Sequence, residues 1–132
     1  MTLVDSNVLI DILTRDPVWF AWSREKMEAA ASAGPILFNE AVYAEISVGY
    51  ATIERLDFAL AEIGIAFAPT SRPALFLAGK AFQHYRARGG LRTGVLPDFF
   101  IGAHAALLGA TLLTRDSGRY RTYFPSLDLI AP

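Results

Sequence analysis

The first regular elements of the chain are contained in Thr2-Leu3-Val4-Asp5-Ser6-Asn7, an apolar run that ends abruptly in polar residues. We expect a buried strand from Thr2 to Asp5. Ser6 or Asn7 can cap a helix that continues through Thr14, because apolar side chains recur at four-residue spacing along it. A strand that passes directly into a helix is the first unit of an α/β fold.

The rest of the chain repeats this alternation of apolar runs and capped, periodic segments. Further helices are expected at Asp16-Pro17 to Gly34, Asn39 to about Gly49, Thr52 to Glu62, Arg72 to Ala87 and Pro97 to Leu108. Further strands are expected at residues 35–38, 65–67, 110–114 and 127–130, and a loop from Gly89 to Gly94. The pattern predicts an α/β fold with a mostly parallel sheet, and residues 1–132 as one domain.

Composition excludes several classes of protein. The chain has 132 residues, 53% of them hydrophobic and 19% charged, which is enough to bury a core. No apolar run approaches the roughly 18 residues that span a bilayer, and no basic segment precedes the first apolar one, so we expect neither membrane insertion nor a signal peptide. The absence of cysteine excludes disulfides and thiolate zinc sites and suits a cytoplasmic protein.

Charge is unevenly divided along the chain. Residues 1–71 carry four basic and ten acidic side chains (4 − 10 = −6), and residues 72–132 carry eight and three (8 − 3 = +5). The basic residues cluster around Arg86 to Arg92 and around Arg115 to Arg121. A polyanion attracted to the basic half would be held beside Asp98 and Asp116. Alternatively, these basic side chains are ordinary solvated charges on loops.

Four isolated carboxylates, Asp5, Glu45, Asp98 and Asp116, each follow or interrupt an apolar segment. Buried acids need a partner or a cation, and four of them together repel one another unless a cation neutralises them. Oxygen ligands suit Mg²⁺ or Mn²⁺. The pattern therefore predicts a metal-dependent enzyme that acts on phosphate esters, with one or two ions.

The positions of these acids in the expected strands and helices indicate that the fold brings them together. Asp5 and Asp116 end or follow strands, and ligands of parallel α/β sheets bind at the carboxyl ends of the strands. Asp98 starts a helix, where the dipole favours an ionised carboxylate, and Glu45 lies mid-helix on an apolar face. Taken singly, Asp98 could be only a helix cap, Asp116 a turn residue and Glu45 a solvated helix residue. No serine–histidine pair lies in a strand–turn–helix elbow, so we expect direct attack by water.

Four segments of the chain resemble motifs of the PIN-domain nucleases. Asp5-Ser6-Asn7 is similar to their Asp-x-Asn opening, and the segment from Asn39 to Gly49, with Glu45, to their second motif. Pro97-Asp98-Phe99-Phe100-Ile101-Gly102-Ala103 resembles the third motif and Thr114-Arg115-Asp116 the fourth. The length and spacing look most like VapC-type toxins of bacterial toxin–antitoxin pairs.

The resemblance implies a PIN-like, three-layer α/β/α fold with a five-stranded sheet. It also implies cleavage of RNA that depends on Mg²⁺ or Mn²⁺, a homodimer, and inhibition by a cognate antitoxin protein. Asp5, Glu45, Asp98 and Asp116 inherit the metal-site roles. Asn7 and Thr114 inherit supporting ones, as hydrogen-bonding residues that orient a carboxylate or water.

Other polar and aromatic residues have two interpretations each. His104 lies about 600° around the helix from Asp98 and is interpreted as a hydrogen-bonded helix residue; His84 is interpreted as a surface residue or an RNA contact. The aromatic side chains of the second helix, Trp19, Phe20 and Trp22, could belong to the core or form an exposed apolar groove for an antitoxin segment. We expect them to be partly exposed. Tyr120 and Tyr123 either stack on RNA bases or lie in a loop packed against the sheet.

Two other functions compete with a ribonuclease toxin. A haloacid-dehalogenase-like phosphatase would use Asp5 as nucleophile, but it needs a second aspartate where this chain has Asn7, and a later lysine in a matching context. The other is an RNA-processing nuclease or a non-catalytic RNA-binding module without a toxin role. Loss of an acid would favour the non-catalytic module, and none of the four is missing.

Overall fold

Five short strands form one sheet in the order β3-β2-β1-β4-β5. The computed structural model describes residues 1–132. The strands are β1 (Thr2–Val4), β2 (Ile36–Phe38), β3 (Ala66–Phe67), β4 (Thr111–Leu113) and β5 (Leu129–Ile130). All neighbours are parallel, with Leu3 opposite Leu37 on one side and Leu112 on the other. The predicted parallel sheet is confirmed, without an antiparallel strand.

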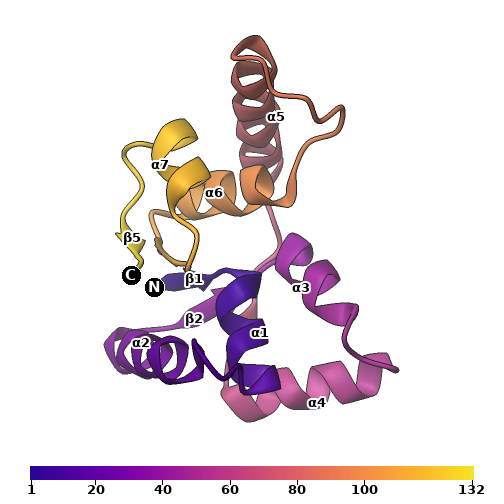
Figure 1. Ribbon diagram of the computed structural model, residues 1–132, viewed down its shortest axis with the longest axis vertical. Helices are drawn as coiled ribbons and strands as arrows, with labels where there is room; N and C mark the ends of the chain where they lie inside the picture. The colour runs from indigo at the N-terminus through magenta and orange to yellow at the C-terminus, as the bar shows by residue number, and fades with distance from the viewer.

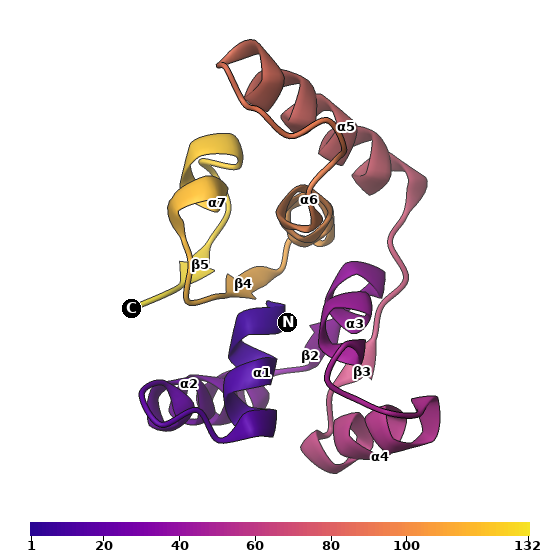
Figure 2. The ribbon, with the colours of Figure 1, turned by 45° about the vertical axis from the view of Figure 1, so that its right-hand side comes forward.

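The chain has seven helices. They are α1 (Ser6–Thr14), α2 (Phe20–Ala33), α3 (Glu40–Ser47), α4 (Ile53–Ile63), α5 (Arg72–Ala87), α6 (Pro97–Leu108) and α7 (Gly118–Tyr123). Helices α5, α6 and α7 lie on one side of the sheet, and α1, α2 and α4 lie on the other (Figures 1 and 2). This is the expected α/β/α arrangement of three layers. No helix combines the length and the apolar character that a membrane span requires.

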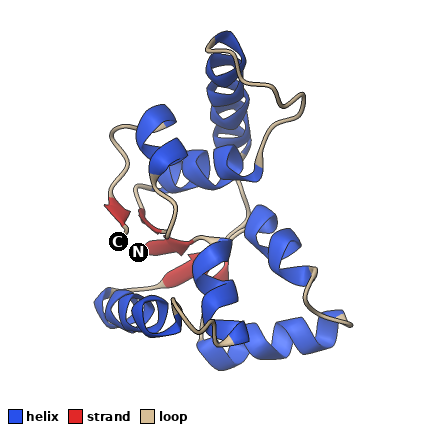
Figure 3. Cartoon of the chain, viewed as in Figure 1, coloured by secondary structure: helices blue, strands red, loops and turns tan.

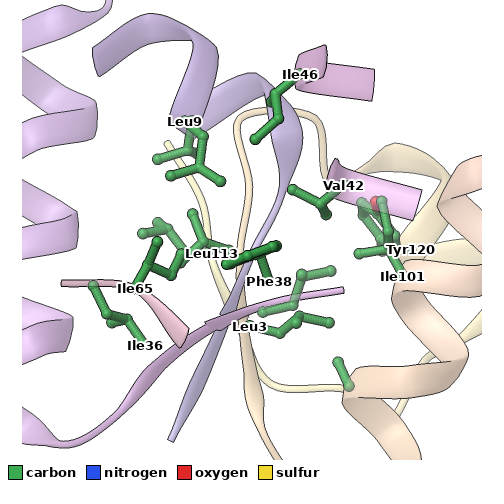
Figure 4. Packing of buried hydrophobic residues seen from close by; sticks show 14 of the residues in the cluster. Leu3, Leu9, Ile36, Phe38, Val42, Ile46, Ile65, Ile101, Leu113 and Tyr120 are labelled. Carbon is green, nitrogen blue, oxygen red and sulfur yellow. The ribbon is translucent and has the colours of Figure 1, made fainter. Parts of the chain in front are cut away.

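The strands are short relative to the helices (Figure 3), so the core depends on a few fully buried residues from each. Leu3 and Val4 of β1 and Leu112 and Leu113 of β4 have no exposed surface. Figure 4 shows Leu3, Leu113 and Phe38 packed between side chains of the helices on either side. Burial of one such side chain stabilises the fold by about 1.5–3 kcal/mol.

The direction in which the chain adds strands to the sheet reverses between β1 and β4. From β1 the chain continues to β2 and β3 on one side, and from β4 it continues to β5 on the other. Such a switch point leaves a crevice at the carboxyl ends of the two central strands, and ligands of open α/β sheets bind there. The backbone N–H of Asp5 donates to the carbonyl of Leu113 at 2.9 Å, so the two strand ends stay paired up to this crevice.

Two predicted helix boundaries and one predicted loop differ from the structure. Asp5, rather than Ser6 or Asn7, is the cap of α1, because its carboxylate accepts from the backbone N–H of Ser6. The helix expected from Pro17 begins at Phe20, since Asp16 accepts from the N–H groups of Val18 and Trp19 at 2.9 Å and closes a turn first. Helix α7 was expected as a loop, because six residues are too few to show helical periodicity.

Candidate active site

Asp5 lies at the switch point and is almost completely enclosed, with 4% of its surface exposed. Its Oδ1 accepts from the backbone N–H of Ser6 at 2.7 Å. Its Oδ2 accepts from the hydroxyls of Thr114 at 2.8 Å and Tyr120 at 2.9 Å. Burial raises the pKa of Asp5, and these hydrogen bonds oppose that rise because they favour the ionised carboxylate.

Glu45 and Asp98 complete a group of three acids, called here the acid triad (Asp5, Glu45 and Asp98). The hydroxyl of Ser6 donates to Oε1 of Glu45 at 3.0 Å and so joins α3 to the end of β1. Burial raises the pKa of Glu45, and the negative charges of Asp5 and Asp98 raise it further. The charge of Asp98 likewise raises the pKa of Asp5. The structure thus brings these three predicted residues into one electrostatically coupled group.

Asp116 does not join this group. Its side chain is exposed and accepts no hydrogen bond, and it is absent from the charges that shift the pKa values of Asp5 and Glu45. Only its backbone is tied to the site, through its N–H, which donates to the hydroxyl oxygen of Thr114 at 3.1 Å. Asp116 instead lines a hollow of about 370 Å³, together with Arg119.

Asn7 and Thr114 lie where supporting residues were expected. The hydroxyl of Thr114 donates to Asp5, and the side-chain nitrogen of Asn7 lies 3.3 Å from that hydroxyl oxygen and 3.4 Å from Oδ2 of Asp5. The side-chain oxygen of Asn7 accepts from the backbone N–H of Arg115 at 3.1 Å. The two side chains therefore join the start of α1 to the loop after β4, directly beside Asp5.

Tyr120 is a site residue that the sequence did not identify as one. It is 1% exposed and donates its hydroxyl to Asp5. Burial and the charges of the acid triad raise its pKa well above the ordinary value, so the phenol stays a donor. For Tyr120 this burial confirms packing against the core, whereas stacking of Tyr123 on an RNA base stays a prediction. Gly102 permits this packing, since a Cβ there would lie 2.5 Å from the ring of Phe124 and 3.1 Å from that of Tyr120.

Two arginines near the acid triad have different environments. Arg115 donates through Nε and Nη2 to both oxygens of Asp11, at 2.6 and 3.0 Å, and Asp11 is 1% exposed. Arg119 donates only through Nη1, to Oδ2 of Asp98 at 2.8 Å, and both side chains are partly exposed. Arg115 thus secures α1 against the loop after β4, whereas Arg119 lies at the acid triad itself.

A second polar network ties together the two helices that carry Glu45 and Asp98. His104 of α6 is buried, with Nδ1 lying 3.1 Å from the side-chain nitrogen of Asn39 and 3.3 Å from the hydroxyl of Thr70. Thr70 in turn donates to Glu40, at the start of α3. Burial lowers the pKa of His104 and favours the neutral ring, whose Nδ1 can then accept from Asn39. The expected hydrogen-bonded helix histidine is confirmed.

The remaining candidates lie away from the acid triad. His84 is exposed, as expected for a surface residue. Trp19, Phe20 and Trp22 are half-buried, which confirms partial exposure. Trp19 packs edge-on against Trp22 with ring centres 5.8 Å apart, and the guanidinium of Arg115 lies 5.0 Å from the centre of the Trp19 ring. A groove for an antitoxin at this position stays a prediction.

The donor set of the acid triad suits a hard divalent cation. Carboxylate oxygens and the hydroxyl of Ser6 are oxygen ligands of the kind that Mg²⁺ and Mn²⁺ prefer, and the charges that raise the pKa values of Asp5 and Glu45 are those a cation would neutralise. The three carboxylates lie farther apart than the ligands of a bound ion do. No group of three or more acidic, histidine or cysteine side chains is close enough together to hold an ion.

A cleft of about 700 Å³ opens beside Glu45, between α3 and the helices α5 and α6. Its lining is mostly apolar and includes Val48, Leu75 and Phe100, with Glu40 and Thr70 of the second polar network at one side. The cleft is large enough to admit part of a polymeric substrate or a side chain of a partner protein.

Comparison with known proteins gives a family match and several structural matches. The family model described as the PIN domain matches residues 2–125. VapBC2 from Rickettsia felis, solved bound to a promoter DNA fragment, matches with a TM-score of 0.76 at 20% identity over 99% of this chain and 98% of that one.

Two further solved structures show the same fold. DNA-bound VapBC from Salmonella typhimurium matches with a TM-score of 0.72 at 17% identity, over 98% of this chain and 96% of that one. A toxin–antitoxin complex from Klebsiella pneumoniae matches with a TM-score of 0.68 at 24% identity and the same coverage. A search of curated proteins found no match.

Proposed function

The chain belongs to the PIN domain family, and on that premise we propose that it is a metal-dependent endoribonuclease, the toxin of a toxin–antitoxin pair. The observation that carries the proposal is the acid triad at the switch point of the sheet, with Asp5 held by Ser6, Thr114 and Tyr120. Carboxylates that raise one another's pKa values are stable together when a cation shares their charge. RNA is the proposed substrate.

The proposed metal ligands are Asp5, Glu45 and Asp98, with Asp116 as a lesser contributor because its carboxylate lies apart from the acid triad. Mg²⁺ or Mn²⁺ is the proposed ion. When bound, such a cation lowers the pKa of water and offsets charge on a phosphodiester. The chain's own residues provide the orientation: Thr114 and Tyr120 hold Oδ2 of Asp5, and Ser6 keeps Asp5 and Glu45 at the same strand end.

The proposed partners are a cognate antitoxin and a second copy of the chain. The support for the antitoxin is the likeness in fold to chains solved as VapBC complexes and as a toxin–antitoxin complex. Large apolar side chains are also exposed on the helices that border the 700 Å³ cleft, among them Val48 and Phe76, at 88% and 69%. Exposed apolar surface of this kind is typical of contact sites between proteins.

The enzymatic proposal is tested with purified protein, single-stranded RNA and either Mg²⁺ or Mn²⁺. We expect cleavage that EDTA stops, and a loss of about a thousandfold in Glu45→Gln and in Asp98→Asn. Asp128→Asn is the matched control, because Asp128 is an exposed acid outside the site. Full activity in both triad variants, with circular dichroism showing an intact fold, would defeat the proposal.

The toxin role needs a separate experiment. Induced expression of the chain should arrest bacterial growth, and expression of Asp98→Asn should not. Co-expression of a cognate antitoxin should restore growth. Cleavage in the test tube without growth arrest would instead favour an RNA-processing nuclease, and RNA binding without cleavage would favour a non-catalytic module.

A further inference from the structure

Arg119 contacts the acid triad through a single hydrogen-bond donor. A guanidinium has five N–H donors, and in Arg119 a single one, on Nη1, is used, in the 2.8 Å contact with Oδ2 of Asp98. The side chain of Arg119 is 38% exposed and that of Asp98 is 28% exposed. The other donors of Arg119 make no hydrogen bond within the protein, although they lie next to a carboxylate of the proposed active site.

Arg115 shows what a purely structural arginine looks like in this molecule. Its guanidinium makes two hydrogen bonds with the buried Asp11, and Ser23 donates to the same carboxylate at 2.6 Å. Its guanidinium also lies over the ring of Trp19. Arg115 therefore has two hydrogen bonds to a buried carboxylate and a ring contact, whereas Arg119 has one hydrogen bond, to a partly exposed carboxylate, and a more distant ring contact.

Arg119 also lines a hollow. This is the hollow of about 370 Å³ named above, and its lining also includes Tyr85, Thr122 and Tyr123. The guanidinium carbon of Arg119 lies 5.8 Å from the centre of the Tyr85 ring. The hollow thus offers an anion two kinds of donor, guanidinium and hydroxyl, and Arg119 links it to Asp98; Asp116 is the one acid in its lining.

We propose that Arg119 binds a phosphate of the RNA strand next to the scissile bond, with the strand entering the hollow lined by Tyr85 and Tyr123. The inference rests on the proposed ribonuclease function. Its physical reason is that the acid triad repels a polyanion, and a cation placed against Asp98 reduces that repulsion where the strand must approach. Arginine suits this role better than lysine, because its planar fork donates two parallel hydrogen bonds to a phosphate.

The test measures binding of a fluorescein-labelled single-stranded RNA by anisotropy, in EDTA and over a range of KCl concentrations. Loss of one phosphate contact should weaken binding by Arg119→Ala about tenfold and lower the slope of log affinity against log salt by about 0.7. Arg119→Lys should fall between wild type and Arg119→Ala. Arg121→Ala is the control, since Arg121 is exposed on the same helix and its side chain makes no hydrogen bond or ion pair. Equal affinities and slopes for Arg119→Ala and Arg121→Ala would overturn the proposal.

A second measurement distinguishes phosphate binding from a role in holding Asp98. Calorimetric titration of RNA-free protein with Mn²⁺ should show that Arg119→Ala binds the ion at least as tightly as wild type, because the substitution removes a competing cation from Asp98. Weaker Mn²⁺ binding with an unchanged salt slope would mean that Arg119 only positions Asp98, and would overturn the inference. Because the anisotropy experiment needs no turnover, a wild-type protein that binds RNA through Arg119 but does not cleave it contradicts the proposed function alone.

Discussion

The carboxyl ends of β1 and β4 are neighbours in the sheet, and an aspartate follows each, yet the two aspartates have opposite surroundings. Asp5 is 4% exposed and accepts hydrogen bonds from three different residues at 2.9 Å or less. Asp116 is exposed and its carboxylate accepts none. The end of β4 contributes mainly Thr114, whose hydroxyl donates to Asp5. Position at a strand end therefore brings an acid near the site, and the surrounding side chains decide whether it enters.

The largest effect should come from exchanging each of these two acids for its amide. Asp5→Asn should reduce RNA cleavage by about a thousandfold, because the substitution removes the central charge of the acid triad. Asp116→Asn should reduce it by about tenfold, the lower end of the range for a residue that supports a metal site without holding the ion. Initial rates at saturating Mg²⁺ measure both. Equal losses would show that Asp116 reaches the metal when substrate is bound, and the contrast drawn above would then fail.

A substitution in the loop after β4 should have the next largest effect, in this case on stability. Arg115→Ala leaves Asp11 buried without its cation, which costs about 3–5 kcal/mol in the free energy of unfolding. Arg121→Ala, at an exposed position, should change it by less than about 0.5 kcal/mol. Urea unfolding followed by circular dichroism gives both values. A small effect of Arg115→Ala would mean that water reaches Asp11 and that α1 is not secured to this loop by the ion pair.

Tyr120 allows a smaller and more specific test of how Asp5 is enclosed. Tyr120→Phe removes one donor to a charged acceptor and should cost about 1.5–3 kcal/mol of stability. It should also raise the pKa of Asp5 further, because that hydrogen bond lowers it. Tyr123→Phe is the matched control, since the hydroxyl of Tyr123 makes no hydrogen bond and its ring is half-buried. If the two variants unfold alike, the phenol of Tyr120 does not hold Asp5.

The smallest expected effect is on the pH dependence of the metal-free protein. Asp5 has a higher pKa folded than its unfolded value of 3.8, so the folded chain retains its proton more tightly. Stability therefore falls as pH rises from 3.8 through the folded pKa, and this loss is fully present above that pKa and absent below 3.8. Glu45 acts in the same direction, since its pKa is also raised.

The stability difference between wild type and Asp5→Asn isolates the contribution of Asp5, because the other groups titrate in both proteins. That difference should move in favour of wild type as pH falls, and unfolding temperatures measured in EDTA from pH 4 to pH 8 test it. A difference independent of pH would show that folding does not raise the pKa of Asp5 and would contradict this expectation. Addition of Mn²⁺ should stabilise wild type at neutral pH more than it stabilises Asp5→Asn.

Much of this molecule was predictable from its sequence, because the signals involved are local. Apolar runs ending in polar residues located all five strands, and caps and glycines located six of the seven helices, α2 with its start misplaced by three residues. The same signals marked Asp5, Glu45 and Asp98, which are acids interrupting apolar segments. Helix α7 and the cap of α1 were missed, since the first is too short to show a period and the second depends on how one carboxylate turns.

By itself, the sequence determined the order of strands and helices and the identity of the acids, because hydrophobic period and capping act between residues close in the chain. Only the tertiary structure decided which side chains reach Asp5. Tyr120 donates to it from 115 residues away, and Thr114 from 109. Likewise, packing alone placed Arg119 on Asp98 and Asp116 in solvent. The physical reason is that hydrogen bonds and charge coupling depend on distances of a few ångströms, which only the folded chain establishes between residues far apart in sequence.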